Sequence, residues 1–332
     1  MNKKENLLKV MNFETPDRIP FAFWYHFSPD ADEGMKAVQQ HLDLYREADF
    51  DLIKIMCDGF FNYPNPQIAE FTKASDWNKL RPLGPDHPWV RRQIWRAAEI
   101  VKRVAGECCV FYNVFNPMSL LRFAVGYDRL MEDIAADSDA VRHAFAVVGE
   151  DVRSLVRGLI TEAGCDGIYY CVQNAETFRF TADQYRAIVR PAELAVLEYA
   201  NTLSENNILH CCGWAGDKNR IEVWQDYPAK CVNWAVYTED MSLRKGREFF
   251  GGKAVLGGFE NTKQGILYSG TKEEVQKETK KIVLEAGPEG LIVGADCTVP
   301  ADIDHERFHW VREALDEIEP EVIVPIRIQL QP

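Results

Sequence analysis

Eight short apolar segments, separated by stretches of helical periodicity, constrain the fold of this chain more than any other feature. The expected strands cover 21–27, 51–58, 108–116, 167–173, 208–212, 231–236, 253–259 and 290–297. Strands that alternate with helices are typical of a parallel sheet with helical crossovers. Eight such units close into a barrel, and a chain of 332 residues is within the usual length of one barrel domain. We therefore predict an α/β protein with a single (β/α)8 TIM barrel over residues 1–332.

The two ends of the sequence add features to this barrel. Apolar spacing over 6–11 predicts a short N-terminal helical extension before the first strand. Apolar residues alternate over 321–332 and predict an extra strand, which Pro325 would confine to a sheet edge. That strand could pack on its own barrel or on a second subunit, so a homodimer is possible. An open doubly wound sheet is the alternative fold, although no Gly-x-Gly-x-x-Gly motif follows a strand.

Three metal-ligating side chains lie at the ends of two expected strands. His210 and Cys212 are two residues apart, so a strand points both to the same face and turns Cys211 to the other. Cys297 ends the last expected strand, and the carboxyl ends of barrel strands form the active-site face. One imidazole and two thiolates suit zinc and leave one tetrahedral position for a fourth protein group or a substrate. Any one of them alone would be typical of an ordinary buried residue.

Composition and charge narrow the class of protein. Nine cysteines in a chain without a secretory signal or a membrane-length apolar run favour free thiols and metal ligation. We expect a soluble cytoplasmic protein that does not associate with a membrane. The net charge of −13 argues against nucleic acid as a partner. It also argues against a highly anionic substrate, unless Arg and Lys cluster locally.

Several motifs resemble those of the uroporphyrinogen decarboxylase superfamily, in its branch of zinc-dependent, corrinoid-linked methyltransferases. The resemblance covers most of the chain and is carried by LHCCG at 209–213, LGGFEN at 256–261, SGTKEEV at 269–275 and the strand that ends at Cys297. It implies zinc ligation by His210, Cys212 and Cys297. It also implies transfer of a methyl group between a corrinoid (cobalamin), held by a partner protein, and a small-molecule donor or acceptor such as a thiol or an O- or N-methyl compound.

One segment departs from the decarboxylases themselves. They carry an Arg-rich segment after the first strand that binds the tetrapyrrole carboxylates, whereas 27–34 of this chain has no Arg and three acids. These acids would repel a poly-carboxylate, so we do not expect porphyrinogen decarboxylation. The alternatives are a decarboxylase or lyase of the same superfamily acting on a smaller substrate, and a non-catalytic barrel that binds a partner.

Other polar residues at expected strand ends are candidates for chemistry or substrate contact, although most such residues are structural hydrogen-bonding groups. Asp58 occupies the place of the key aspartate of the decarboxylases. The candidate catalytic residues are Asp58, Glu176 and Glu260, and the candidate substrate-binding residues are His26, Asn113, Gln173 and Tyr237. The aromatic residues of the long loop after the second strand either wall the barrel mouth or anchor the loop: Phe60, Phe61 and Tyr63.

A second zinc motif competes with the first. His305-Glu306-Arg307-Phe308-His309 matches His-Glu-x-x-His, which on a helix places both imidazoles on one face. In the barrel it falls on the last outer helix, away from the centre of the mouth, so we interpret it as a solvated helix face with Phe308 turned inward.

Overall fold

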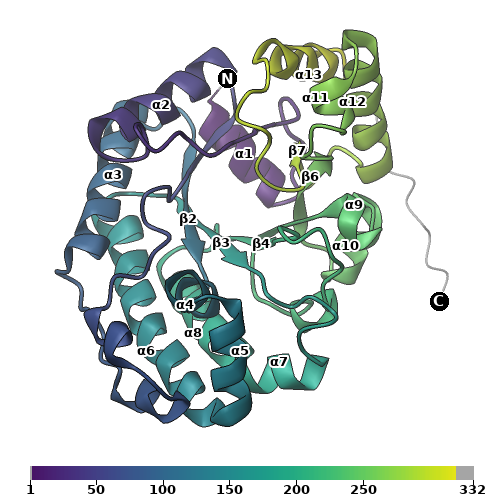
Figure 1. Cartoon of the computed structure of the whole chain (residues 1–332). Helices are drawn as coiled ribbons and strands as arrows, with labels where there is room; N and C mark the ends of the chain where they lie inside the picture. The colour runs from purple at the N-terminus through teal and green to yellow at the C-terminus, as the bar shows by residue number, and fades with distance from the viewer. Residues whose placement is uncertain (1, 319–332) are drawn as a thin grey trace.

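A computed structural model describes residues 2–318, and seven parallel strands form its inner layer (Figure 1). Neighbouring strands pair in chain order. The strands are β1 (Leu52–Ile55), β2 (Cys109–Phe115), β3 (Gly167–Val172), β4 (Ile208–Cys211), β5 (Cys231–Trp234), β6 (Ala254–Phe259) and β7 (Leu291–Ala295). Nearly every strand residue is buried, as expected of a parallel sheet covered on both faces. The α/β fold is therefore confirmed, and the curled sheet is consistent with a TIM-like barrel.

Helices form the layer outside the strands (Figure 1). The α-helices are α1 (Lys3–Met11), α2 (Gly34–Glu47), α3 (Pro88–Val104), α4 (Pro117–Val125), α5 (Tyr127–Ala136), α6 (Ser138–Arg157), α7 (Ala182–Ile188), α8 (Arg190–Leu203), α9 (Val236–Glu239), α10 (Leu243–Phe249), α11 (Ile266–Ser269), α12 (Lys272–Ala286) and α13 (Glu306–Asp316). Short 3-10 or π turns are η1 (Pro66–Glu70), η2 (Ala74–Lys79), η3 (Gly158–Glu162) and η4 (Ile221–Val223). Of the helices within residues 2–318, none combines the length and the apolar character needed to cross a bilayer.

The prediction of a first strand over 21–27 is wrong. Phe21 makes one isolated parallel bridge to Val293, and the N–H of Asp51 donates to the carbonyl of Phe21 at 3.0 Å. The segment thus lies between β7 and β1, but its backbone does not continue as a ladder. Further along, the carbonyl of Trp24 accepts from the N–H of Val299, and the N–H of Phe27 donates to the Asp58 carboxylate. Because these groups take loop and side-chain partners, the described sheet has seven strands and not eight.

One element was predicted at each end of the chain: a helix over 6–11 and a strand over 321–332. Helix α1 begins at Lys3, earlier than the predicted 6–11, because the side chain of Asn2 accepts from the N–H groups of Lys4 and Glu5. The predicted strand over 321–332, with the homodimer that it suggested, lies outside the described residues. Two strands end just before candidate ligands: β4 ends at Cys211, before Cys212, and β7 ends at Ala295, before Cys297.

Candidate metal centre

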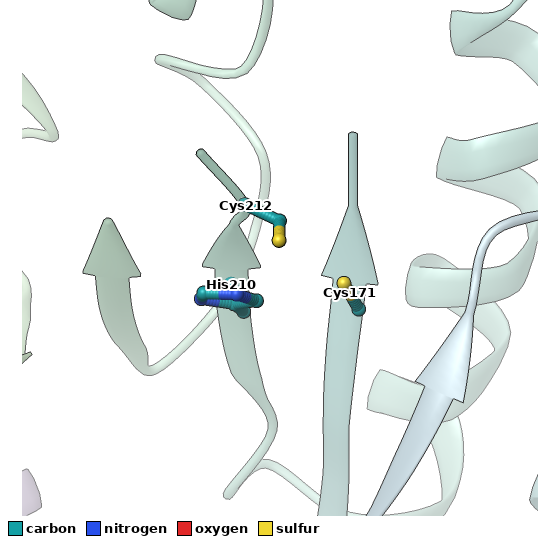
Figure 2. Close-up of side chains that lie close together, drawn as sticks. All are labelled: Cys171, His210 and Cys212. Atoms are coloured by element: carbon teal, nitrogen blue, oxygen red, sulfur yellow. The ribbon is translucent and has the colours of Figure 1, made fainter. Parts of the chain in front are cut away.

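Neighbouring strands β3 and β4 bring a thiol, an imidazole and a second thiol together. Cys171 is in register with His210, so their side chains share one face of the sheet. Cys212 directly follows β4, and its N–H donates to the carbonyl of Val172 at 2.9 Å, which extends the ladder by one residue. The ligand atoms of Cys171, His210 and Cys212 all lie within 4.8 Å of one another (Figure 2).

Cys297 adds a third thiol from a distant strand. It lies two residues beyond the end of β7, and its Sγ is 3.9 Å from the Sγ of Cys212. The curvature of the sheet therefore joins the ends of β3, β4 and β7 at one place. We call Cys171, His210, Cys212 and Cys297 the thiol cluster.

The electrostatics of the thiol cluster fit a bound cation. Contact with the Cys212 thiol and burial raise the pKa of Cys297 to about 12. Contact with the Cys171 thiol and burial likewise raise the pKa of Cys212 well above its ordinary value. Adjacent thiolates repel one another, and a divalent cation removes that repulsion. The buried Nδ1 of His210 also has no hydrogen-bond partner within the described residues. Three sulfurs and one imidazole are the donor types that zinc prefers.

The thiol cluster opens on a cavity of about 510 Å³. This volume suits a small-molecule ligand. Three of the residues expected to bind substrate line the cavity: His26, Asn113 and Gln173. The side-chain amide of Asn113 donates to the Cys57 Sγ at 3.0 Å, and the side-chain amide oxygen of Gln173 accepts from Arg122 at 2.7 Å.

His26 and Asp58 form a dyad at the rim of this cavity. Nδ1 of His26 lies 2.7 Å from one oxygen of Asp58, whose other oxygen accepts from the N–H of Phe27 at 2.9 Å. The Asp58 carboxylate is buried, while the His26 side chain is 51% exposed. Asp58 therefore fixes the orientation of the imidazole.

The remaining candidates lie outside the lining of the cavity. Glu176 is buried and pairs with Arg179 at 2.9 Å. Glu260 accepts a hydrogen bond from the hydroxyl of Thr262. Tyr237 is 49% exposed and borders a different hollow beside α12.

The aromatic residues of the long loop after β1 were expected either to wall the cavity or to anchor the loop, and both roles occur. Phe61 lines the cavity. Phe60 and Tyr63 are buried anchors, and the Tyr63 hydroxyl donates to Asp151 at 2.5 Å. The loop therefore contributes one aromatic wall residue and two structural ones.

The His-Glu-x-x-His motif lies away from the thiol cluster. His305 precedes α13, and its ring nitrogens lie 3.0 Å from the Glu47 carboxylate and 3.2 Å from the Tyr25 hydroxyl. Phe308 is fully buried, as expected. In the part of the chain that the structure describes, Cys171, His210 and Cys212 are the only His, Cys or carboxylate group found with metal-binding spacing, and neither histidine of the motif belongs to it.

Among the charged and metal-ligating side chains that line the cavity, sequence reasoning missed three: Lys54, Arg122 and Cys171. Cys171 has a local signal, since it ends an apolar segment with the same strand-end position as His210. Arg122 lies on a helix, and no spacing in the sequence relates it to strands formed elsewhere in the chain.

A barrel-like α/β fold with a thiol-lined cavity at its strand ends defines a class of enzyme scaffold, and comparison with known proteins identifies the family. Residues 60–318 match the family model described as uroporphyrinogen decarboxylase (URO-D). The chain therefore belongs to the uroporphyrinogen decarboxylase family, and the resemblance noted in the sequence is confirmed. No curated protein sequence matches the chain.

The solved structures that are similar to this chain include two with extensive coverage of both chains. A methyltransferase from Methanosarcina mazei superposes with a TM-score of 0.74 at 15% identity, covering 96% of this chain and 99% of that one. A B12-independent methionine synthase from Shewanella sp. W3-18-1, in complex with selenomethionine, gives a TM-score of 0.54 at 13% identity, covering 90% and 97%. At these identities the likeness is one of fold.

Proposed function

We propose that this protein is a zinc-dependent methyltransferase that moves a methyl group between a corrinoid protein and a small-molecule donor or acceptor. The observation that carries the proposal is the thiol cluster at the edge of a ligand-sized cavity. Membership of the uroporphyrinogen decarboxylase family and the fold shared with a methyltransferase support it. The acceptor or donor is a thiol or an O- or N-methyl compound.

We assign zinc to His210, Cys212 and Cys297. Cys171 is a fourth donor within reach, and the coordination position that it would occupy is the one that a substrate would take in its place. Zinc held there would act as a Lewis acid, lowering the pKa of a thiol or polarising a methylated oxygen or nitrogen. His26 moves the proton at Nε2 that this chemistry releases or needs, and Asp58 positions its ring. The corrinoid reaches the cavity from a partner protein.

Metal content and cobalt spectroscopy test this function. Protein purified without chelator should contain about one zinc per chain. Methylcobalamin and cob(I)alamin differ in absorbance, so mixing the protein with methylcobalamin and 2-mercaptoethanol should give a spectral change that metal-free protein does not. Metal-free but fully active protein would contradict the role of zinc. Release of CO2 from a carboxylated substrate without any cobalamin change would favour the decarboxylase alternative.

A further inference from the structure

The cavity beside the thiol cluster has a charge opposite to that of the whole chain. The chain carries 51 acidic and 38 basic residues. Yet none of the residues lining this cavity, all of them within the described range, is Asp or Glu, whereas Lys54 and Arg122 both line it. A cation-lined cavity in an acidic protein selects its ligand by charge, because its local potential differs from that of the surrounding surface.

Arg122 is the cation best placed to bind a ligand. It lies on α4 and is only 9% exposed. Its side-chain hydrogen bond within residues 2–318 goes to the neutral amide oxygen of Gln173 at 2.7 Å, and its buried Nε has no partner there. No carboxylate of the described chain pairs with this guanidinium, and a buried, unpaired charge is costly.

Aromatic rings hold the guanidinium in place. Its central carbon lies 4.3 Å from the ring centroid of Phe123 and 4.6 Å from that of Trp214. Gln173, which accepts its hydrogen bond, also donates to Cys171 Sγ at 3.5 Å. The side chain of Gln173 therefore connects Arg122 to the thiol cluster.

Lys54, on β1, is the second cation that lines the cavity. Its ammonium nitrogen lies 4.2 Å from the ring centroid of Tyr169 and 4.7 Å from that of Trp24. The ring of Tyr169 in turn packs against His210 with centroids 5.1 Å apart. Lys54 is thus adjacent to the thiols and adds to the positive potential there.

An apolar wall faces the ligand space next to Arg122. The rings of Phe61, Phe115 and Phe123 line the cavity and contact one another, with centroids 5.1 to 5.6 Å apart. Such a wall buries the flat apolar body of a ligand, while a guanidinium fork binds a planar or trigonal anion through paired N–H donors.

We propose that the cavity binds a small organic monoanion, whose carboxylate or sulfonate group contacts Arg122 and whose apolar, aromatic-sized body packs on Phe61, Phe115 and Phe123. This inference rests on the proposed function, because it names the substrate class of the same site: the methyl donor or acceptor carries an anionic group.

Three matched ligands test the inference by isothermal titration calorimetry: 4-methoxybenzoate, 4-methoxybenzenesulfonate and the neutral 4-methoxybenzamide. The purified protein should bind at least one of the two anions about tenfold or more tightly than the amide. Which anion binds better distinguishes a carboxylate from a sulfonate ligand. Equal affinity for all three, or no binding of either anion, overturns the inference.

Variants locate the anion contact. Arg122→Met should abolish the preference for the anion, and Arg122→Lys should retain part of it because the charge stays while the fork is lost. Arg142→Met is the matched control, since Arg142 pairs with Asp139 on the outer face of α6. Full anion preference in a folded Arg122→Met protein overturns the assignment. If Arg122→Met is unfolded by thermal melting, Arg122→Lys decides, and full anion preference in that variant overturns the assignment.

Failure of this inference is distinguishable from failure of the proposed function. Ligand binding is measured without cobalamin and without turnover. Anion-selective binding that depends on Arg122, in a protein that never alters methylcobalamin, contradicts methyl transfer alone. Methyl transfer to or from neutral and anionic compounds with equal efficiency contradicts the substrate class alone.

Discussion

Two buried polar clusters of this protein differ in whether their groups satisfy one another. The carboxylate of Glu193, on α8, accepts hydrogen bonds from the hydroxyls of Tyr185 at 2.8 Å and Tyr227 at 2.6 Å and from the amide of Asn116. The thiol cluster instead leaves Nδ1 of His210 without a partner in residues 2–318 and presents its sulfurs to one another.

The Glu193 cluster has the features of a structural polar cluster, whereas the thiol cluster has those of a ligand site. Both oxygens of Glu193 accept hydrogen bonds, and Glu193 does not line the 510 Å³ cavity. In the thiol cluster, Nδ1 of His210 lacks a hydrogen-bond partner among the described residues, and the cluster borders that cavity. A buried polar group without a partner is costly, and a bound ligand removes the cost. We therefore expect substitutions in the thiol cluster to change ligand binding, and substitutions around Glu193 to change stability.

The largest expected effect is loss of metal. Cys212→Ser and Cys297→Ser should each lose zinc and methyl transfer, because thiolates supply most of the ligand field. Elemental analysis and the cobalamin assay measure both. The double variant His305→Ala/His309→Ala should keep its zinc. Loss of zinc from that variant, with retention in Cys212→Ser, would move the metal to the last helix.

The next effect concerns proton transfer at the cavity rim. His26→Gln should lower kcat by roughly 10²–10⁴-fold, the usual contribution of a general acid or base, with zinc content unchanged. Asp58→Asn should have a smaller effect and alter the pH profile of kcat, because Asp58 acts through the ring that it orients. An unchanged rate in His26→Gln would remove the residue from the mechanism.

Substitution of Cys171 tests whether the thiol on β3 belongs to the metal site. We expect Cys171→Ser to weaken zinc binding by about tenfold or more, since second-sphere or ligand changes at zinc sites have effects of this size. Competition with a chromophoric chelator measures it. Cys165→Ser is the matched control, because Cys165 is also buried but lies at the opposite end of β3. Equal zinc affinity in both variants would exclude Cys171.

Much of the fold could be predicted from local patterns. Seven of the eight expected apolar segments contain strands, because buried parallel strands are short continuous apolar runs between helices. The segment over 21–27 has the same pattern but lacks the ladder. Its apolar residues are buried by aromatic packing, as Phe23 is against Phe50 and Phe308, and apolarity alone does not distinguish the two.

The site was predictable only in part. The spacing of His210 and Cys212 and the strand-end position of Cys297 place them at one cavity without reference to other strands. The pairing of Cys171 with His210 depends on the register of β3 and β4, which parallel strands far apart in sequence do not reveal. Arg122 comes from a helix, so its place beside Trp214 follows from tertiary packing alone.

The contribution of Glu193 to stability depends on pH. Burial raises the pKa of Glu193 from 4.5 to about 7, despite its hydrogen bonds. The fold therefore favours the neutral acid: its stabilising contribution is complete below pH 4.5 and is lost as pH rises to about 7. Glu193→Gln should gain stability relative to the unaltered protein between pH 5 and pH 8, on the order of 2 kcal/mol. Chemical denaturation measures this, with exposed Glu198→Gln on the same helix as control. A pH-independent difference would contradict it.

The smallest effect is expected at Cys211, which lies between two proposed ligands. In a strand its side chain points away from His210 and Cys212, and Cys211 is buried without lining the cavity that both neighbours line. It should therefore act as a small packing residue between sheet and helices. Cys211→Ala removes one sulfur from that layer, so we expect a loss of about 1 kcal/mol of stability with unchanged zinc. Zinc stoichiometry and thermal unfolding of this variant measure both. A folded Cys211→Ala protein without metal would show that Cys211, and not Cys212, is the partner of Cys297, and the contrast between ligand and packing sides of β4 would be reversed.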